Sequence, residues 1–116
     1  MTCRLFQPME DSPYCVVLVS CATDKEAATI SRALVREKLA ACVNRLGPAY
    51  STYFWEGQLE EASEYLLMVK TTKNALPSLS KRLKALHSYD EPEVVALPIL
   101  GGSSSYLNWL GQNVHL

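Results

Sequence analysis

The strongest candidate for chemistry in this chain is His87, which opens the stretch HSYDEPEV at residues 87–94. The stretch combines an imidazole, a phenol and three carboxylates within eight residues. An imidazole joined by a thiolate suits copper or zinc, whereas carboxylates alone suit magnesium or calcium. We therefore predict that His87 is a metal ligand, with Cys42 as a second ligand if the fold or a neighbouring subunit brings that thiol close.

Both candidate ligands also have a structural interpretation. A histidine that ends a helix can interact with the unpaired carbonyl groups there, since they attract positive charge. Cys42 follows two alanines at a predicted junction between helix and strand, where a small buried residue is the commoner explanation. Tyr89, Asp90 and Glu91 would then form an exposed turn, and Pro92 would hold the residue before it extended. The residues alone leave both interpretations open.

Hydrophobic patterning predicts the first strand and the first helix. The run YCVVLVSC at 14–21 is apolar and rich in β-branched residues, which indicates a strand covered on both faces. Cys15 and Cys21 lie roughly 20 Å apart in such a strand, so they cannot bind one ion together. Thr23 followed by Glu26 is a capping-box signature for the helix that comes next.

The second half of the chain repeats this alternation. Strands are predicted over 41–55 and 58–72, joined by a two-residue turn, and a helix capped by Asn74 follows. The run EVVALPI at 93–99 predicts a last strand. A short helix beginning near residues 103–105 then ends the chain.

The resulting order β-α-β-β-α-β is that of an α+β, ferredoxin-like sandwich with a long hairpin and a short C-terminal helix. The most apolar strand segments, 14–21 and 64–70, should be central. Strands that contain Pro48 and Pro98 should lie at the edges, where a missing N–H is tolerated. An antiparallel sheet of order 4-1-3-2 satisfies both conditions.

The predicted hairpin is longer than six-residue strands require and is aromatic at its end. Tyr50, Tyr53, Phe54 and Trp55 lie there. A long aromatic edge strand promotes aggregation unless something covers it, and another copy of the chain is the usual cover. We therefore predict a homo-oligomer, with Trp55 and Trp109 as packing anchors.

Charged residues on the third strand suggest a cleft between subunits. Glu64 and Lys70 share a strand face but are six residues apart, too far to pair directly. Such charges usually lie at strand ends in solvent. The alternative is that they line an inter-subunit cleft, whose predicted residues are Tyr53, Trp55, Glu64, Lys70, Tyr89 and Glu93.

Composition excludes several classes of function. The 116 residues carry 11 Lys and Arg against 12 Asp and Glu, so no excess charge attracts nucleic acid or an anionic membrane. No apolar run approaches the roughly 20 residues of a membrane span. Residues 1–12 lack the apolar core of a signal peptide. We expect a flexible extension there, one domain over 13–116 and a cytoplasmic protein whose thiols stay reduced.

Four segments together resemble the CutA family of divalent-cation tolerance proteins. They are EKLAACVN (37–44), YSTYFWEGQLEEASEYLLMVKTT (50–72), LKALHSYDEPEVVALPI (83–99) and YLNWL (106–110). The resemblance covers nearly the whole chain after Pro13. It implies a ferredoxin-like fold, a tightly packed homotrimer and a link to tolerance of copper and other divalent metals.

Two positions depart from the family pattern. Ser88 stands where the family usually has a proline, so the loop after the helix should be less rigid. Some members carry a cysteine late in the first strand that has been proposed as a copper ligand. The equivalent position here is Val19, and Cys21 lies two residues on, on the same strand face. Cys21 is therefore the third candidate metal ligand.

Three functional hypotheses follow. The first is a non-enzymatic trimer that binds Cu²⁺ or another divalent cation. The second is a PII-like signalling trimer that senses a small ligand in its inter-subunit clefts. The predicted partners are other copies of the chain and an unidentified protein or small ligand. The third is an enzyme, which we do not expect, because the sequence has no Ser-His-Asp order, HExxH or phosphate-binding loop.

Overall fold

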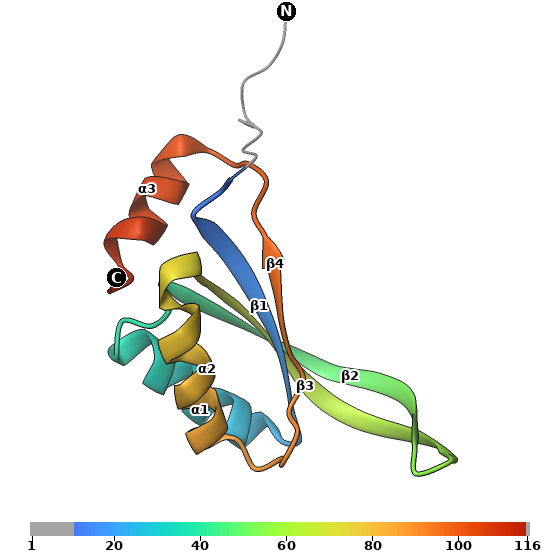
Figure 1. The fold of residues 1–116 in the computed structure, drawn as a ribbon. Helices are drawn as coiled ribbons and strands as arrows, with labels where there is room; N and C mark the ends of the chain where they lie inside the picture. The colour runs from blue at the N-terminus through green and yellow to red at the C-terminus, as the bar shows by residue number, and fades with distance from the viewer. Residues whose placement is uncertain (1–10, 116) are drawn as a thin grey trace, which may run out of the picture.

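The computed structural model describes residues 11–115. The expected extension over 1–12 therefore lies outside the described residues, apart from Asp11 and a buried Ser12. The elements follow the predicted order (Figure 1): β1 (Tyr14–Cys21), α1 (Asp24–Arg36), β2 (Cys42–Trp55), β3 (Gln58–Thr72), the 3-10 turn η1 (Lys73–Ala75), α2 (Leu76–Leu86), β4 (Val94–Pro98) and α3 (Ser104–Gln112).

The four strands form one antiparallel sheet in the order β2-β3-β1-β4. Counted from the β4 edge, this order reads 4-1-3-2, the arrangement expected from the sequence. The proline-containing strands β2 and β4 are the two edges, where Pro48 and Pro98 deprive no inner strand of a hydrogen bond. The α+β class and the antiparallel sheet are confirmed.

Helices α1 and α2 lie on the same side of this sheet (Figure 1). Cys15, Val17 and Val19 of β1 point toward them and are at most 2% exposed. Ile30 and Leu83 complete this core from the helix layer. The intervening residues of β1 face the other way, and the strand alternates between partly and fully buried positions. The prediction that β1 is covered on both faces is therefore wrong for the single chain, because both helices pack on one face.

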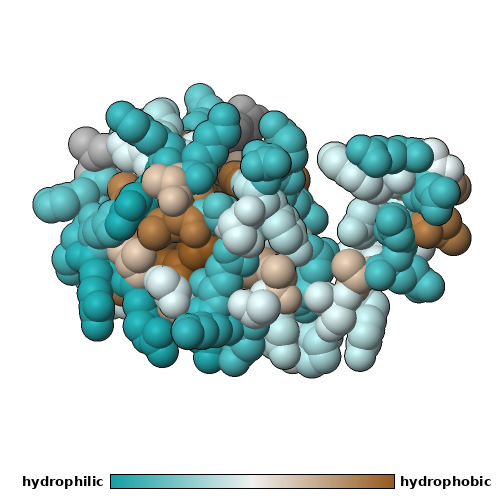
Figure 2. Space-filling model, turned by 90° about the horizontal axis from the view of Figure 1, so that it is seen from below, coloured by the Kyte–Doolittle hydropathy of each residue, from teal (hydrophilic) through white to brown (hydrophobic). Residues whose placement is uncertain are grey.

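The hairpin of β2 and β3 extends well beyond the rest of the sheet (Figure 1). Its end stands clear of the body and bears hydrophobic surface among polar side chains (Figure 2). Phe54, Trp55 and Leu59 are 73%, 59% and 62% exposed there. The two turn residues, Glu56 and Gly57, both have positive φ angles, as the tight turns of β-hairpins require.

Two of the three predicted helix starts are confirmed. The Thr23 hydroxyl accepts a hydrogen bond from the Glu26 N–H at 3.1 Å, and Ser103 caps α3 in the same way. Asn74 does not cap α2, because the chain passes through η1 first and α2 begins without a side-chain cap. No helix within residues 11–115 is long and apolar enough to cross a membrane.

Candidate metal centre

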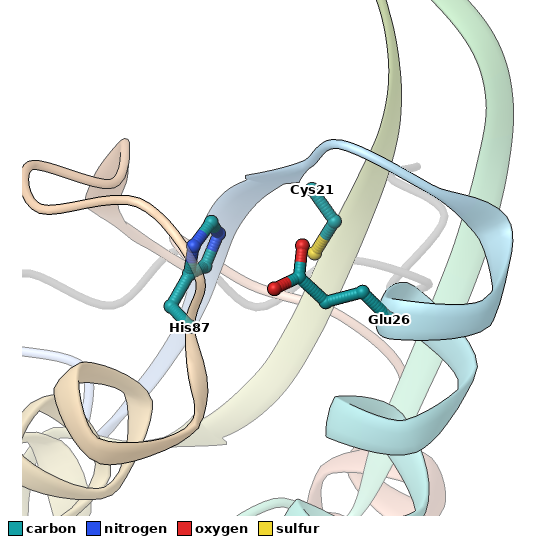
Figure 3. Close-up of side chains that lie close together, drawn as sticks. All are labelled: Cys21, Glu26 and His87. Carbon is teal, nitrogen blue, oxygen red and sulfur yellow. The ribbon is translucent and has the colours of Figure 1, made fainter.

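Three residues that could bind a metal ion meet where β1 ends, α1 begins and α2 ends. They are Cys21, Glu26 and His87, and their side chains point toward one another (Figure 3). One ligand atom from each, a thiol sulfur, a carboxylate oxygen and an imidazole nitrogen, lies within 4.8 Å of the other two. Cys21 is fully buried and His87 is 8% exposed. The cluster therefore offers three different donor atoms in a largely dry place.

Local structure accounts for each position. Cys21 is the last residue of β1 and shares the helix-facing side of that strand with Val19. Glu26 lies in the first turn of α1, and His87 is the residue at which α2 ends. Helix α1 follows β1 after a short connection, while α2 returns its C-terminal end to the same place (Figure 1). The fold thus brings together residues that are up to 66 positions apart.

The hydrogen bonds of His87 define its tautomer. Its Nε2 lies 2.6 Å from the carbonyl oxygen of Ser20, and its Nδ1 accepts a hydrogen bond from the Tyr89 N–H at 3.1 Å. A carbonyl oxygen can only accept, so Nε2 carries the proton and the ring is neutral. The imidazole therefore bonds to β1. The alternative that it interacts with the carbonyl groups ending its own helix is wrong.

The carboxylate of Glu26 bridges two segments. Its Oε2 accepts a hydrogen bond from the Ser88 N–H at 2.8 Å, and its Oε1 accepts one from the Ala22 N–H at 3.3 Å. Burial acts to raise the pKa of Glu26, but hydrogen bonds from the side chain and backbone of Ser88 and from the backbone of Ala22 outweigh it, so that the pKa lies below its ordinary value. Glu26 is therefore ionised at neutral pH.

The thiol of Cys21 is held in its protonated form. Burial, together with the negative charges of Glu26 and Glu64, raises its pKa from 9.0 to about 12. A thiol must lose its proton to bind a metal. A cation that binds here consequently has to displace a proton from sulfur, which favours ions with strong affinity for thiolate.

A second set of polar residues surrounds the cluster. The Tyr89 hydroxyl donates to Glu64 at 3.1 Å, and the Ser20 hydroxyl donates to Glu93 at 3.0 Å. The Tyr89 ring lies against the His87 ring, with 4.8 Å between centroids. Burial and the Glu64 carboxylate raise the pKa of Tyr89 to about 12.

These contacts correct two expectations. Glu64 is 9% exposed and bonded within its own chain, so the interpretation that places it in solvent is wrong. Tyr89 is half-buried and does not belong to an exposed turn.

Cys42 is not part of this cluster within the chain. It pairs with Lys70 across β2 and β3, whereas Cys21 pairs with Tyr65. Five residues separate the two partners on β3, which corresponds to roughly 17 Å, and an odd separation also puts the two thiols on opposite faces of the sheet. The predicted pairing of His87 with Cys42 is therefore not made within the chain.

Two of the predicted cleft residues lie away from this cluster within the chain. The Lys70 ammonium group is 5.8 Å from the centroid of the Tyr106 ring, near α3. Trp55 ends β2 at the tip of the hairpin. Tyr53, by contrast, is 44% exposed and interacts electrostatically with Tyr89. Glu64, Tyr89 and Glu93 are thus the predicted cleft residues that the structure gathers around the metal-ligand cluster.

Glu26 was not predicted from the sequence as a member of the cluster. Its capping-box position relative to Thr23 fully explained a glutamate there. The available signal was that a capping glutamate lies directly after the strand that ends in Cys21, so its carboxylate has to lie near the end of that strand.

Comparison with known proteins gives consistent matches. A family model described as "CutA1 divalent ion tolerance protein" matches residues 15–113. The "Divalent-cation tolerance protein CutA" of Thermus thermophilus is 51% identical over 98 residues, which cover 84% of this chain and 95% of that protein. The "Protein CutA, chloroplastic" of Arabidopsis thaliana is 42% identical over 107 residues, which cover 92% of this chain but 59% of the plant protein.

Solved structures agree with the sequence matches. The structure of the divalent cation tolerance protein Cut A1 from Thermus thermophilus superimposes with a TM-score of 0.86 at 49% identity, covering 88% of this chain and 99% of that one. The structure of CutA1 from Oryza sativa superimposes with a TM-score of 0.87 at 40% identity, covering 90% of this chain and 95% of that one. These matches extend over the strands and helices that form the Cys21, Glu26 and His87 cluster.

Proposed function

Because the chain belongs to the CutA1 divalent ion tolerance family, we propose that it binds copper or a similar divalent cation through Cys21, Glu26 and His87. One observation carries this proposal: the three ligand atoms lie within 4.8 Å of one another in a largely buried place. The proposed role is binding without catalysis. It replaces Cys42 by Glu26 in the ligand set expected from the sequence.

The donor set favours some ions over others. Thiolate and imidazole suit copper and zinc, and one carboxylate oxygen is compatible with both. Magnesium and calcium prefer oxygen ligands throughout, so a sulfur and a nitrogen donor argue against them. The cluster is therefore suited to thiophilic divalent cations.

Binding has to disturb the loop that follows α2. Both ring nitrogens of His87 are engaged, one with the Ser20 carbonyl group and the other with the Tyr89 N–H. A metal ion needs one of these nitrogens as a lone-pair donor, so at least one of the two hydrogen bonds must break. If Nε2 becomes the ligand, the proton moves to Nδ1, which can then no longer accept from Tyr89. We expect cation binding to move residues 87–89.

Metal titration under anaerobic, reducing-agent-free conditions tests the proposal. Zn²⁺ and Cu²⁺ should each bind the wild type, and Cys21→Ser, Glu26→Gln and His87→Ala should each weaken binding by at least about tenfold. Matched controls are Cys42→Ser and the exposed His115→Ala, which should bind like the wild type. Affinities that stay unchanged in all three cluster variants would exclude this site.

The pH dependence provides a second criterion. A ligand thiol must be deprotonated, and the raised pKa of Cys21 means that a cation displaces its proton throughout the neutral range, so affinity should fall steadily as the pH is lowered. A surface site made of carboxylates alone would keep its affinity until considerably lower pH.

We also propose that the protein assembles as a homotrimer. The support is the uncovered sheet face, on which Val95 and Leu97 of edge strand β4 are 45% and 46% exposed, together with the apolar hairpin end. Such surfaces are typical of subunit contacts. The number of subunits comes from the family resemblance.

A reducing compartment such as the cytoplasm would suit the cluster, because Cys15, Cys21 and Cys42 are free thiols and a ligand cysteine must stay reduced. The proposal specifies a reducing environment and not one compartment, because the Arabidopsis thaliana relative is named "chloroplastic". Thiol alkylation in intact cells, followed by mass spectrometry of the protein, would test whether Cys42 is reduced there.

A further inference from the structure

Glu26 has two possible structural tasks, and the hydrogen bonds show which one dominates. A capping-box glutamate returns to the backbone N–H of the residue that caps its own helix. The capping residue of α1 is Thr23, but Glu26 accepts a bond of 3.3 Å from the N–H of the preceding Ala22 and a shorter one of 2.8 Å from the Ser88 N–H. Both bonds are made by an ionised carboxylate and are about twice as strong as neutral ones. Because the bond to Ser88 is the shorter of the two, the better contact of Glu26 is made across 62 residues of sequence.

The residue that donates this bond is the neighbour of a proposed ligand. Ser88 follows His87 directly, so one short segment both carries the imidazole and holds the carboxylate. The backbone of His87 is in turn anchored by its own N–H bond to Leu83 at 2.9 Å. A displacement of residue 88 would consequently change the positions of two of the three donor groups together.

We infer that the backbone N–H of Ser88 is a positioning group, which holds the Glu26 carboxylate against Cys21 and His87 and thereby sets which cations the cluster prefers. This inference rests on the proposed metal site. The carboxylate is the only hard donor of the three. Compared with a thiolate ligand, a hard oxygen ligand favours Zn²⁺ over the softer Cd²⁺. With Ser88 in place, the site presents oxygen as well as sulfur and nitrogen.

Two substitutions together separate the N–H of Ser88 from its hydroxyl group, which also hydrogen-bonds Glu26. Proline lacks the N–H group and also requires an extended residue before it. His87 already has φ −82° and ψ 141°, so Ser88→Pro places no new demand on it. The matched control is Ser88→Ala, which removes the exposed hydroxyl group but keeps the N–H.

The experiment measures Zn²⁺ and Cd²⁺ affinity of the wild type, Ser88→Pro and Ser88→Ala by competition with a chromophoric chelator. We expect Ser88→Pro to lose about tenfold in Zn²⁺ affinity and clearly less in Cd²⁺ affinity, as for other residues that orient a ligand. Ser88→Ala removes the hydroxyl contact to Glu26 but keeps the N–H, so it should lose clearly less Zn²⁺ affinity than Ser88→Pro. A general distortion of the loop would instead weaken both ions equally, and that result would overturn the inference.

Glu26→Gln keeps the test informative if Ser88→Pro perturbs the fold. In the Glu26→Gln background, Ser88→Pro should have no further effect on the Zn²⁺ to Cd²⁺ affinity ratio, because the group being positioned is changed. Hydrogen exchange gives a readout without metal: the Ser88 amide should be protected in the wild type and exchange faster in Glu26→Gln.

The outcomes separate this inference from the proposed function. Failure of the wild type to bind either ion would remove the metal site and the inference with it. Normal binding combined with an unprotected Ser88 amide, or with an unchanged ion ratio in Ser88→Pro, would overturn the positioning role alone.

Discussion

The Nε2 atom of His87 lies 2.6 Å from the carbonyl oxygen of Ser20, and this bond joins the end of α2 to the end of β1 across 67 residues of sequence. The ring is 8% exposed, so neither partner has ready access to water. The hydrogen bond therefore contributes to the fold before any metal is considered, and it closes the loop that a cation would have to move.

Replacing His87 should destabilise the metal-free protein. His87→Ala leaves the Ser20 carbonyl and the Tyr89 N–H without their partner, and an unsatisfied buried polar group costs about 1–3 kcal/mol. Urea unfolding with a chelator present measures this change. His115→Ala, at an exposed position, should change the free energy of unfolding little. Equal effects of the two substitutions would contradict the structural role of the bond.

Removing the Tyr89 hydroxyl should isolate the contribution of its bond to Glu64. Tyr89→Phe deprives a carboxylate that is 9% exposed of a donor at 3.1 Å, and hydrogen bonds to charged groups contribute about 1.5–3 kcal/mol. Tyr50→Phe is the control, because Tyr50 is 78% exposed.

A double-mutant cycle then assigns the effect. Tyr89→Phe should cost much less in a Glu64→Gln background than in the wild type, because the charged acceptor is gone. If the two substitutions are simply additive, the loss does not come from this bond.

The raised pKa of Cys21 predicts a loss of stability in alkaline solution. The pKa rises from 9.0 in the unfolded chain to about 12 in the folded protein, so the folded state keeps its proton more tightly. The contribution of the protonated Cys21 thiol to the free energy of unfolding is fully present below about pH 9, and it is lost as the pH rises toward 12.

Unfolding experiments in reductant at about pH 8 and about pH 10 would measure this loss. The free energy of unfolding should fall more between these conditions for the wild type than for Cys21→Ala. Tyr89 also has a raised pKa and contributes equally to both proteins, so it cancels in the comparison. Parallel pH dependences would mean that Cys21 does not titrate as a buried thiol.

The proposed trimer predicts a mass of three times the 12.9 kDa chain in light scattering at micromolar concentration. Leu97→Lys should shift the protein toward the monomer, because it places a charge on the uncovered face of the sheet. Lys84→Glu, on an exposed position of α2, is the control for a change of charge and should leave the mass unchanged. A monomeric wild type would rule out the proposed assembly.

The strands and helices could be predicted because their signals are local. The apolar run of β1, the capping pair at the start of α1 and the two-residue turn of the hairpin each act over a few neighbouring residues. Pro48 and Pro98 indicated which two strands lie at the edges of the sheet, since proline cannot donate a hydrogen bond to a neighbouring strand. Asn74 shows the limit of such signals, because a turn of 3-10 helix replaced the expected cap.

The metal-ligand cluster shows what the sequence by itself did not determine. His87 could be named as a candidate from its chemistry and Cys21 from the family resemblance, but their contact with Glu26 depends on how the end of α2 meets the start of α1. Cys42 was an equally reasonable partner until the pairing of β2 with β3 placed it on the other face of the sheet. Patterning fixes which face of a strand a residue occupies, whereas strand register and helix packing decide which residues from distant segments meet there.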